Sequence, residues 1–281
     1  MFRICGRAAR RECGPLSIWQ SVELGIDERR TPVRVRLAER NLLAAGEPGA
    51  GKSVGLNLIV AHAALSLDCR LILVDGKRVE LGLWRRCAEA FIGPSITEAI
   101  DLLKHLQTAM DARYDELLTT GRRKITPECG QPVVLVVFDE LAYFSATVGE
   151  PKQQKEFVVL VRDLVARGRA AGIIVVAATQ RPSADIIPTS LRDLFGYRWA
   201  FRCTTDASSD VILGHGWANQ GYSAAEIDPT ARGVGWLIAE GGTPLRMKAA
   251  YLSDDQAARI AEHATQLRTR AAINRNVAGA P

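Results

Sequence analysis

The chain lacks long apolar runs, which argues against membrane-spanning helices and secretory signals. None of its apolar segments approaches the ~20 consecutive apolar residues that a membrane-spanning helix requires. Residues 1–14 are rich in arginine but have no apolar core of the kind found in secretory signals. We therefore expect a cytoplasmic protein that does not cross a membrane itself. Peripheral association with the inner face of the cell membrane, through a membrane-associated partner, stays open.

The cysteines also lack any ordered pattern. No C-x-x-C pair is present, and no cluster of cysteine and histidine has the spacing of zinc ligands. This argues against a zinc site and against a disulfide framework. We expect reduced thiols, several of them buried, at all six positions: Cys5, Cys13, Cys69, Cys87, Cys129 and Cys203.

The composition is that of an ordinary globular protein without repeats or low-complexity blocks. Of the 281 residues, 47% are hydrophobic and 24% are charged, which is enough to build a sizeable core. The net charge of +5 is a mild excess, compatible with a polyanionic partner without demonstrating one. We expect one domain at 21–270, preceded by an Arg- and Cys-rich segment at 1–20 that is either poorly ordered or a docking segment. Residues 271–281 are expected to form a disordered tail.

Strand and helix patterns alternate along this domain. Short apolar runs predict buried parallel strands, and apolar residues at helical spacing predict helices between them. Alternating polarity at 22–26 and 33–37 predicts a hairpin leading into the strand at 42–45. The remaining strands are expected at 71–74, 133–138, 173–178, 197–203 and 234–238, and the helices at 54–65, 96–118, 155–165 and 254–268. This order predicts an α/β fold with a mostly parallel sheet and helices on both faces.

The stretch from Gly46 to Ser53 fits the phosphate-loop pattern G-x-x-x-x-G-K-S. An apolar strand enters it and a helical pattern leaves it, which is the context that this motif requires. Glycines let the backbone N–H groups wrap a phosphate chain at the N-terminus of a helix. The residues expected to bind ATP are Gly46, Glu47, Pro48, Gly49, Ala50, Gly51, Lys52, Ser53 and Val54. Lys52 would reach the β- and γ-phosphates, and the Ser53 hydroxyl would ligate Mg²⁺.

Two further strand ends carry groups suited to hydrolysis of a triphosphate. Asp139 and Glu140 follow the strand at 133–138, and Gln180 follows the strand at 173–178. In an open parallel sheet, ligands bind beyond the carboxyl ends of the strands. We therefore expect Asp139 to hold Mg²⁺, Glu140 to polarise the attacking water and Gln180 to sense the γ-phosphate.

Two arginines on the helical segment before the strand at 173–178 leave two interpretations open. Arg162 and Arg169 lie seven residues apart, so they would share one side of a helix. That side could be an ordinary solvated face. Alternatively, it could supply an arginine to the nucleotide of a neighbouring subunit, a role that suits a permanently charged group.

The ordered set of motifs resembles the FtsK/SpoIIIE family of DNA-translocating ATPases, from about Val22 to Ile238. The similarity includes the phosphate loop, and Asp139 and Glu140 within Val-Phe-Asp-Glu-Leu-Ala. Two stretches are more specific than a phosphate loop: Asp-Gly-Lys-Arg-Val-Glu-Leu at 75–81 and Ala-Thr-Gln-Arg-Pro-Ser at 178–183. The resemblance implies a RecA-like P-loop NTPase that forms a ring, usually a hexamer, around double-stranded DNA and moves it with ATP.

Residue roles follow from the resemblance by position. It gives Lys52, Ser53, Asp139 and Glu140 the roles described above. Gln180 corresponds to the sensor, and Arg169 aligns with the arginine that reaches the neighbouring subunit's site. Arg181 and Arg192 fall where family members place basic residues near DNA. Such contacts with phosphates would be independent of sequence and sensitive to salt.

Three departures from the family pattern qualify this interpretation. Asp206 and Asp210 stand in the loop at 203–210 where family members carry a lysine and an arginine, which puts the grip on DNA through this loop in doubt. We expect no winged-helix module after the motor, and no membrane segment before it. This layout favours the plasmid-transfer or mobile-element branch over the chromosome-segregation branch.

Two other functions remain open from the sequence. One is a related ring ATPase that moves a protein substrate in a secretion machine, which the acidic residues at 206 and 210 favour. The other is a nucleotide-dependent switch with low turnover, against which Asp139, Glu140 and Gln180 argue. In each case we expect no small-molecule substrate other than ATP.

Overall fold

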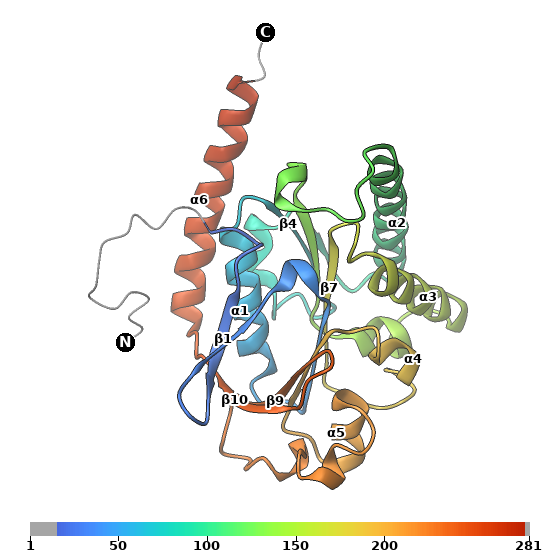
Figure 1. Cartoon of the computed structure of the whole chain (residues 1–281), viewed down its shortest axis with the longest axis vertical. Coiled ribbons are helices and arrows are strands. Elements are labelled where there is room, and N and C mark those ends of the chain that lie inside the picture. Colours follow the sequence, from blue (N-terminus) through green and yellow to red (C-terminus); the bar gives the residue numbers. More distant parts are fainter. Residues whose placement is uncertain (1–15, 279–281) are drawn as a thin grey trace, which may run out of the picture.

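A ten-stranded sheet runs through the computed structural model, which describes residues 16–278 (Figure 1). The strands are β1 (Val22–Asp27), β2 (Pro32–Val35), β3 (Leu42–Ala45), β4 (Cys69–Val74), β5 (Ala90–Ile92), β6 (Val133–Phe138), β7 (Ile173–Thr179), β8 (Tyr197–Phe201), β9 (Val234–Ala239) and β10 (Leu245–Ala249). Their order across the sheet is β2-β1-β10-β9-β8-β3-β7-β6-β4-β5. Each predicted strand is present.

The sheet has a parallel part and an antiparallel part. Strands β8, β3, β7, β6, β4 and β5 are parallel, whereas β9, β10, β1 and β2 extend the sheet in antiparallel pairing. The predicted hairpin of β1 and β2 is confirmed. It pairs with β10 at the edge of the sheet, although it directly precedes β3 in the sequence. The mostly parallel sheet is therefore confirmed, together with an antiparallel extension.

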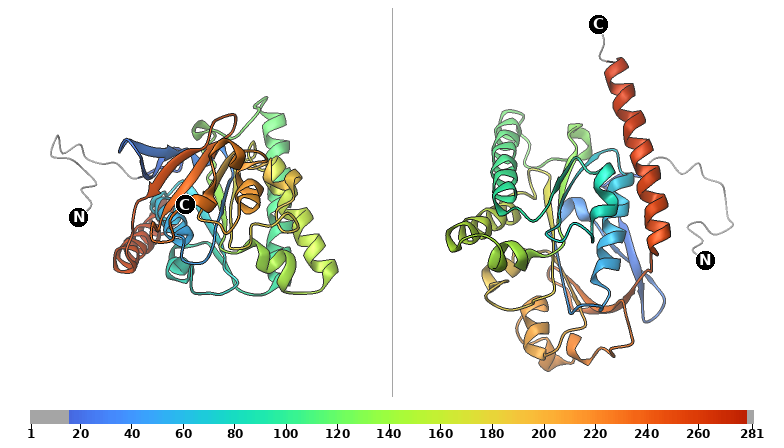
Figure 2. Two further views of the ribbon diagram at one scale, coloured as in Figure 1. Left: turned by 90° about the horizontal axis from the view of Figure 1, so that it is seen from below. Right: turned by 180° about the vertical axis from the view of Figure 1, so that it is seen from behind.

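Helices cover both faces of the sheet (Figures 1 and 2). Helices α1 (Lys52–Leu65) and α6 (Asp254–Ala278) lie on one face, and α2 (Ile96–Thr119) and α3 (Pro151–Arg167) lie on the other. Two shorter helices, α4 (Thr189–Arg192) and α5 (Asp206–Leu213), flank β8 in the chain. Short 3₁₀-helical segments complete the described part of the chain: η1 (Leu37–Glu39), η2 (Gly82–Cys87), η3 (Pro127–Cys129), η5 (Ala218–Gln220) and η6 (Ala224–Glu226), together with the π-helical segment η4 (Tyr143–Thr147).

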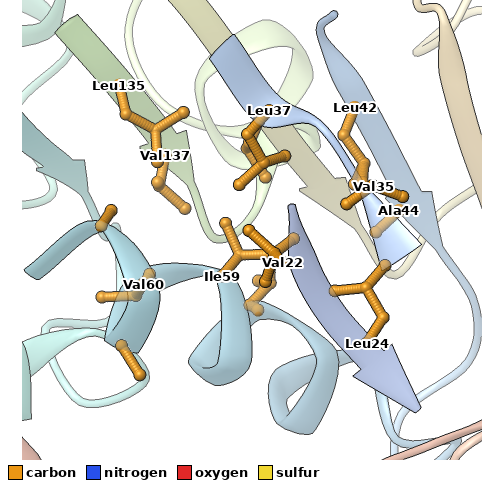
Figure 3. Close-up of a cluster of buried hydrophobic side chains, with 14 of the residues drawn as sticks. Val22, Leu24, Val35, Leu37, Leu42, Ala44, Ile59, Val60, Leu135 and Val137 are labelled. Carbon is orange, nitrogen blue, oxygen red and sulfur yellow. The ribbon is translucent and has the colours of Figure 1, made fainter. Parts of the chain in front are cut away.

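The alternation of side chains along each central strand divides the core into two layers. In β6, Leu135 and Val137 face the layer beneath α1, where they pack with Ile59 of that helix (Figure 3). Val134 and Val136 face the layer beneath α2 and α3. Since every residue of β6 is buried, the strand must be apolar throughout, which is why it is so clear in the sequence. Each such side chain contributes about 1.5–3 kcal/mol on burial.

The predicted starts of the helices at 96 and 254 are confirmed, and side-chain hydrogen bonds cap both of them. The Ser95 hydroxyl accepts a hydrogen bond from the Glu98 N–H (3.2 Å) at the start of α2. At the start of α6, Ser253 and Gln256 form a reciprocal capping box, with bonds of 3.0 and 3.3 Å.

The two ends of the domain differ from the prediction. Helix α6 continues to Ala278 instead of ending near Arg268, so most of the expected tail is helical. The reason is that residues 269–278 contain no glycine or proline and include several good helix formers. At the other end, Ile18 is fully buried in the core and its N–H donates to Asp68 (2.9 Å). The docked segment therefore reaches back at least to Ser17, and residues 1–15 lie outside the described residues.

The cysteines in the described part of the chain are free thiols, as expected. Three of them are buried (Cys69, Cys87 and Cys203) and Cys129 is half-buried; Cys5 and Cys13 lie outside that part.

Candidate functional site

The phosphate loop connects β3 to α1 at the carboxyl edge of the parallel strands. At Gly51 the backbone has φ of 108°, and a Cβ there would lie 2.6 Å from the Cα and N atoms of Gly233. Only glycine fits, because any side chain would collide with backbone. The Gly233 N–H also donates to the Ala50 carbonyl (2.9 Å), which ties the loop to the segment before β9.

The strand order brings three functional strand ends together. Strand β7 lies between β3 and β6, with Ala45 paired to Thr179 and Phe138 paired to Ala177. The expectation that the groups after these three strands meet at one edge is thus confirmed. Lys52 Nζ lies 3.3 Å from the Asp139 carbonyl oxygen, to which it donates a hydrogen bond.

Asp139 is a buried carboxyl with unused hydrogen-bonding capacity. It is fully buried, and neither carboxylate oxygen has a hydrogen-bond partner within residues 16–278. Burial raises its pKa to about 6; Lys52, whose Nζ lies 3.9 Å from Oδ1, opposes the shift, while Glu80 and Asp75 add to it. Buried, unpartnered carboxylate oxygens are the ligands that Mg²⁺ prefers, so the site fits a magnesium ion.

A bound nucleotide would have to complete such a metal site. Among residues 16–278, no group of three or more His, Cys, Asp or Glu side chains is placed to hold a metal ion. This agrees with a Mg²⁺ site that uses one or two protein oxygens together with substrate phosphates. Ser53 and Asp139 are the protein groups that the sequence assigns to this metal ion.

Glu140 is held by the end of the neighbouring strand. Its Oε1 accepts hydrogen bonds from the Thr179 hydroxyl (2.6 Å) and the Ala142 N–H (3.2 Å), and its Oε2 accepts one from the Gln180 N–H (2.8 Å). The carboxylate is therefore fixed in orientation between the ends of β6 and β7. Gln180 takes part in this arrangement through its backbone N–H. Gln180 also lines the adjoining cavity.

A cavity of about 300 Å³ opens above the phosphate loop, and part of its wall was not found from the sequence. Besides the loop, Val54 and Gln180, the wall consists of Arg232, Gly233, Lys248, Ala249 and Tyr251. These residues belong to the antiparallel part of the sheet and the segments next to it. No motif marks them, because their position depends on how β9 and β10 pair with β8 rather than on local sequence.

One loop residue, Glu47, is tied to the segment after β8. Its carboxylate forms an ion pair with Arg202 (2.5 Å) and accepts a hydrogen bond from the Thr204 hydroxyl. Its N–H also donates to the Arg202 carbonyl (2.9 Å). The phosphate loop is therefore directly connected to the segment that leads into α5.

Arg169 lies far from the phosphate loop of its own chain. It precedes β7 at the amino edge of the parallel strands, where its guanidinium lies 3.6 Å from Glu240. It does not share a helix side with Arg162, because α3 ends at Arg167 and Gly168 caps it. Arg162 is exposed on α3. From this position, Arg169 can act only on a nucleotide held by another molecule, and that role stays a prediction.

The two arginines expected near DNA lie in different environments. Arg181 is exposed just beyond β7. Arg192 is only 9% exposed, forms an ion pair with Asp193 (2.8 Å) and donates to the Asp210 carbonyl (3.3 Å) at α5. Burial and these partners count against direct contact between Arg192 and DNA phosphates.

The acidic residues at 203–210 have internal partners. Asp206 accepts a hydrogen bond from the Ser223 hydroxyl (2.5 Å), and Asp210 accepts bonds from the N–H groups of Gly216 (2.7 Å) and Ala218 (2.9 Å). Both carboxylates thus attach α5 to the glycine-rich segment that follows it. Their presence has a structural explanation within this chain.

No helix in the part of the chain from 16 to 278 combines the length and apolar character that crossing a membrane would need.

Comparison with known proteins supports the family resemblance. Residues 17–131 match the FtsK/SpoIIIE family. The DNA translocase FtsK of Streptomyces avermitilis is 32% identical over 269 residues, which is 86% of this chain and 28% of that protein. The DNA translocase FtsK of Pseudomonas aeruginosa is 28% identical over 277 residues, 85% of this chain and 33% of that protein. The chain thus spans about a third or less of these relatives.

Solved structures share the fold. The pCW3 conjugation coupling protein TcpA, in a monomer form with ATPγS, has a TM-score of 0.75 and 23% identity over 89% of this chain and 71% of its own. EssC (ATPases 2 and 3) of Geobacillus thermodenitrificans has a TM-score of 0.73 and 14% identity over 91% of this chain and 50% of its own. The α/β fold of P-loop ATPases, predicted from the sequence, is confirmed.

Proposed function

We propose that this chain, which carries a domain of the FtsK/SpoIIIE family, is an ATP-hydrolysing motor that translocates double-stranded DNA. The observation that carries the proposal is the meeting of Lys52, Asp139, Glu140 and Gln180 at the edge of three adjacent strands. The names of the relatives, DNA translocases and a conjugation coupling protein, support DNA as the cargo. The coupling protein further favours a role in plasmid transfer over chromosome partition.

The hydrolytic step follows from the positions of these groups. The backbone of the phosphate loop and Lys52 would hold the β- and γ-phosphates. Ser53 and Asp139 would hold Mg²⁺, which when bound supplies positive charge next to the phosphate oxygens. Glu140, fixed by three hydrogen bonds, would orient the attacking water and accept its proton.

Hydrogen bonds at the end of β7 would couple ATP hydrolysis to DNA binding. Glu140 bonds to Thr179 and to the Gln180 N–H, and the Thr179 hydroxyl also accepts a bond from the Arg181 N–H (3.1 Å). A change at the γ-phosphate that moves Glu140 would therefore move the backbone that carries Arg181. We assign to Arg181 a contact with DNA phosphates, which would be independent of sequence.

A ring, most simply a hexamer, accounts for the position of Arg169. Its guanidinium lies at the amino edge of the sheet, whereas the phosphate loop lies at the carboxyl edge. In a head-to-tail ring, one such edge of each subunit can face the phosphate loop of the next. An arginine supplied in this way stabilises the charge that develops on the transferred phosphoryl group.

The alternative of a protein cargo is weaker in this chain. Its support in the sequence is the acidic pair Asp206 and Asp210, and both carboxylates are used in internal hydrogen bonds. The low-turnover switch is also disfavoured, because three hydrogen bonds hold the Glu140 carboxylate next to Asp139, an arrangement that supports hydrolysis.

The proposal is tested by ATPase activity with and without duplex DNA across a salt series. We expect DNA to stimulate hydrolysis, and the stimulation to fall as salt rises. Lys52→Ala and Glu140→Gln should abolish turnover. Arg181→Ala should lower the stimulation by DNA and leave the basal rate intact, whereas Arg34→Ala, at an exposed position on β2, serves as the matched control. Hydrolysis that does not respond to DNA would overturn the assignment of DNA as the cargo.

A further inference from the structure

Two hollows in the surface meet at Tyr251. One is the cavity of about 300 Å³ above the phosphate loop. The other is a groove of about 440 Å³ between α1 and α6, which lie side by side in both views (Figures 1 and 2). Tyr251 lines both of them, so the phosphate site and the groove adjoin at this residue.

Residues on one side of α1 also line both hollows. Val54 lines the phosphate cavity, and Leu58, Ala61 and Leu65 line the groove. Their spacing of four, three and four residues places them on one side of the helix. Leu58 lies about 6 Å beyond Val54 along the helix axis. The groove therefore begins within the length of a ribose and base from the phosphate loop.

Tyr251 is held in place although its side chain is exposed. It lies in the short connection between β10 and α6. Before it, the Ala250 N–H donates to the Leu24 carbonyl (2.9 Å); after it, Ser253 and Gln256 form the capping box of α6. The residue is nevertheless 67% exposed, so its ring is accessible to a ligand.

We propose that Tyr251 and the adjoining end of the groove form the nucleobase subsite of the triphosphate site. The inference rests on the proposed function and adds a part of the site that the phosphate-loop motif does not include. A base has a flat apolar face, and stacking on an exposed aromatic ring buries both faces. Leu58 and Ile260 supply apolar surface next to the ring, while the phosphates remain at Lys52.

The test separates the base from the phosphates. Equilibrium binding of ATP and of inorganic tripolyphosphate is measured on the full chain for the wild type, Tyr251→Ala and Tyr251→Phe. Because stacking is lost, Tyr251→Ala should weaken ATP binding roughly 5- to 150-fold and leave tripolyphosphate binding unchanged. Tyr251→Phe keeps the ring and should retain the affinity for ATP. Leu118→Ala, at a position 82% exposed on α2, is the control and should change neither affinity.

Each other outcome has a definite meaning. Equal weakening of both ligands in Tyr251→Ala would assign Tyr251 to the phosphates and overturn the base subsite. Unchanged ATP binding in Tyr251→Ala would overturn it as well, and in both cases the proposed ATPase would stand. A wild-type protein that binds neither ligand would overturn the proposed function and the subsite together.

Discussion

Replacing Thr179 by valine removes one buried hydroxyl and nearly preserves the shape of the side chain. Thr179 is fully buried at the end of β7. Its hydroxyl donates to Glu140 Oε1 (2.6 Å) and accepts from the Arg181 N–H (3.1 Å). A single substitution thus removes one of the two direct connections between the proposed catalytic carboxylate and the segment proposed to contact DNA; the bond from the Gln180 N–H to Oε2 (2.8 Å) remains.

The expected loss of stability in Thr179→Val follows from these two hydrogen bonds. A hydrogen bond to a charged group contributes about 1.5–3 kcal/mol, and one between neutral groups about 0.5–1.5 kcal/mol. Thr179→Val should therefore lower the free energy of unfolding by about 2–4 kcal/mol. Thr179→Ser keeps the hydroxyl and removes one methyl group, so it should cost about 1 kcal/mol. The difference between the two variants isolates the hydroxyl.

Urea unfolding gives these free energies, and ATPase assays give the functional effect. We expect Thr179→Val to lower kcat and to reduce its stimulation by DNA, with Thr179→Ser close to the wild type. The double variant with Glu140→Gln should show non-additive unfolding energies, because the two residues share one hydrogen bond. Equal destabilisation by valine and serine, or additive energies in the double variant, would refute this account of the contact.

The other predictions concern Asp139, the ion pair of Arg202 and Glu47, and Gly55. The pKa of Asp139 is raised to about 6, so the ionised form is lost as pH falls through 6; Mg²⁺-dependent nucleotide binding should weaken in that range, measured against binding in EDTA. The same shift makes the metal-free fold less stable as pH rises from about 4 to 6, and Asp139→Asn should remove this slope in unfolding experiments. Arg202→Ala leaves the Glu47 carboxylate unpaired beside the phosphates and should weaken ATP binding about tenfold, with Glu47→Gln restoring it in a binding assay. Gly55→Ala places a Cβ 2.7 Å from the buried Trp199 ring; overpacking of about 1–3 kcal/mol should exceed the gain of about 1 kcal/mol in helix propensity, which a lower Tm would show.

The phosphate site could be predicted from the sequence because its features depend on local interactions. Lys52 and Ser53 occur at fixed positions because a loop that wraps phosphates requires one backbone geometry. The run before Asp139 is uniformly apolar because β6 is buried on both faces. The N-cap of α2 and the capping box of α6 also follow from the sequence, since each lies within four residues of chain. Features of this kind depend on short-range physics that a single sequence carries.

Long-range pairing set the limits of the prediction. Nothing in the hairpin of β1 and β2 indicates that β10 is its neighbour, because its alternating pattern fits the edge of many sheets. The same holds for Arg232 and Lys248, which reach the cavity through the antiparallel strands. Arg192 was expected near DNA from its position in the motif order, but its burial depends on α5 packing against it.

The antiparallel part of the sheet also connects the phosphate loop to the connection that carries Tyr251. Gly233 donates its N–H to the Ala50 carbonyl (2.9 Å), and its own carbonyl accepts from the Ala249 N–H (2.8 Å). Two residues beyond Ala249 is Tyr251, at the mouth of the groove between α1 and α6. Since Gly51 also packs against Gly233 too closely for any side chain, the loop and this outer wall are directly connected. Nucleotide binding that orders the loop would then order the wall of the base subsite in the same step, so the motif at 46–53 and the unmarked residues at 232–251 act as one site.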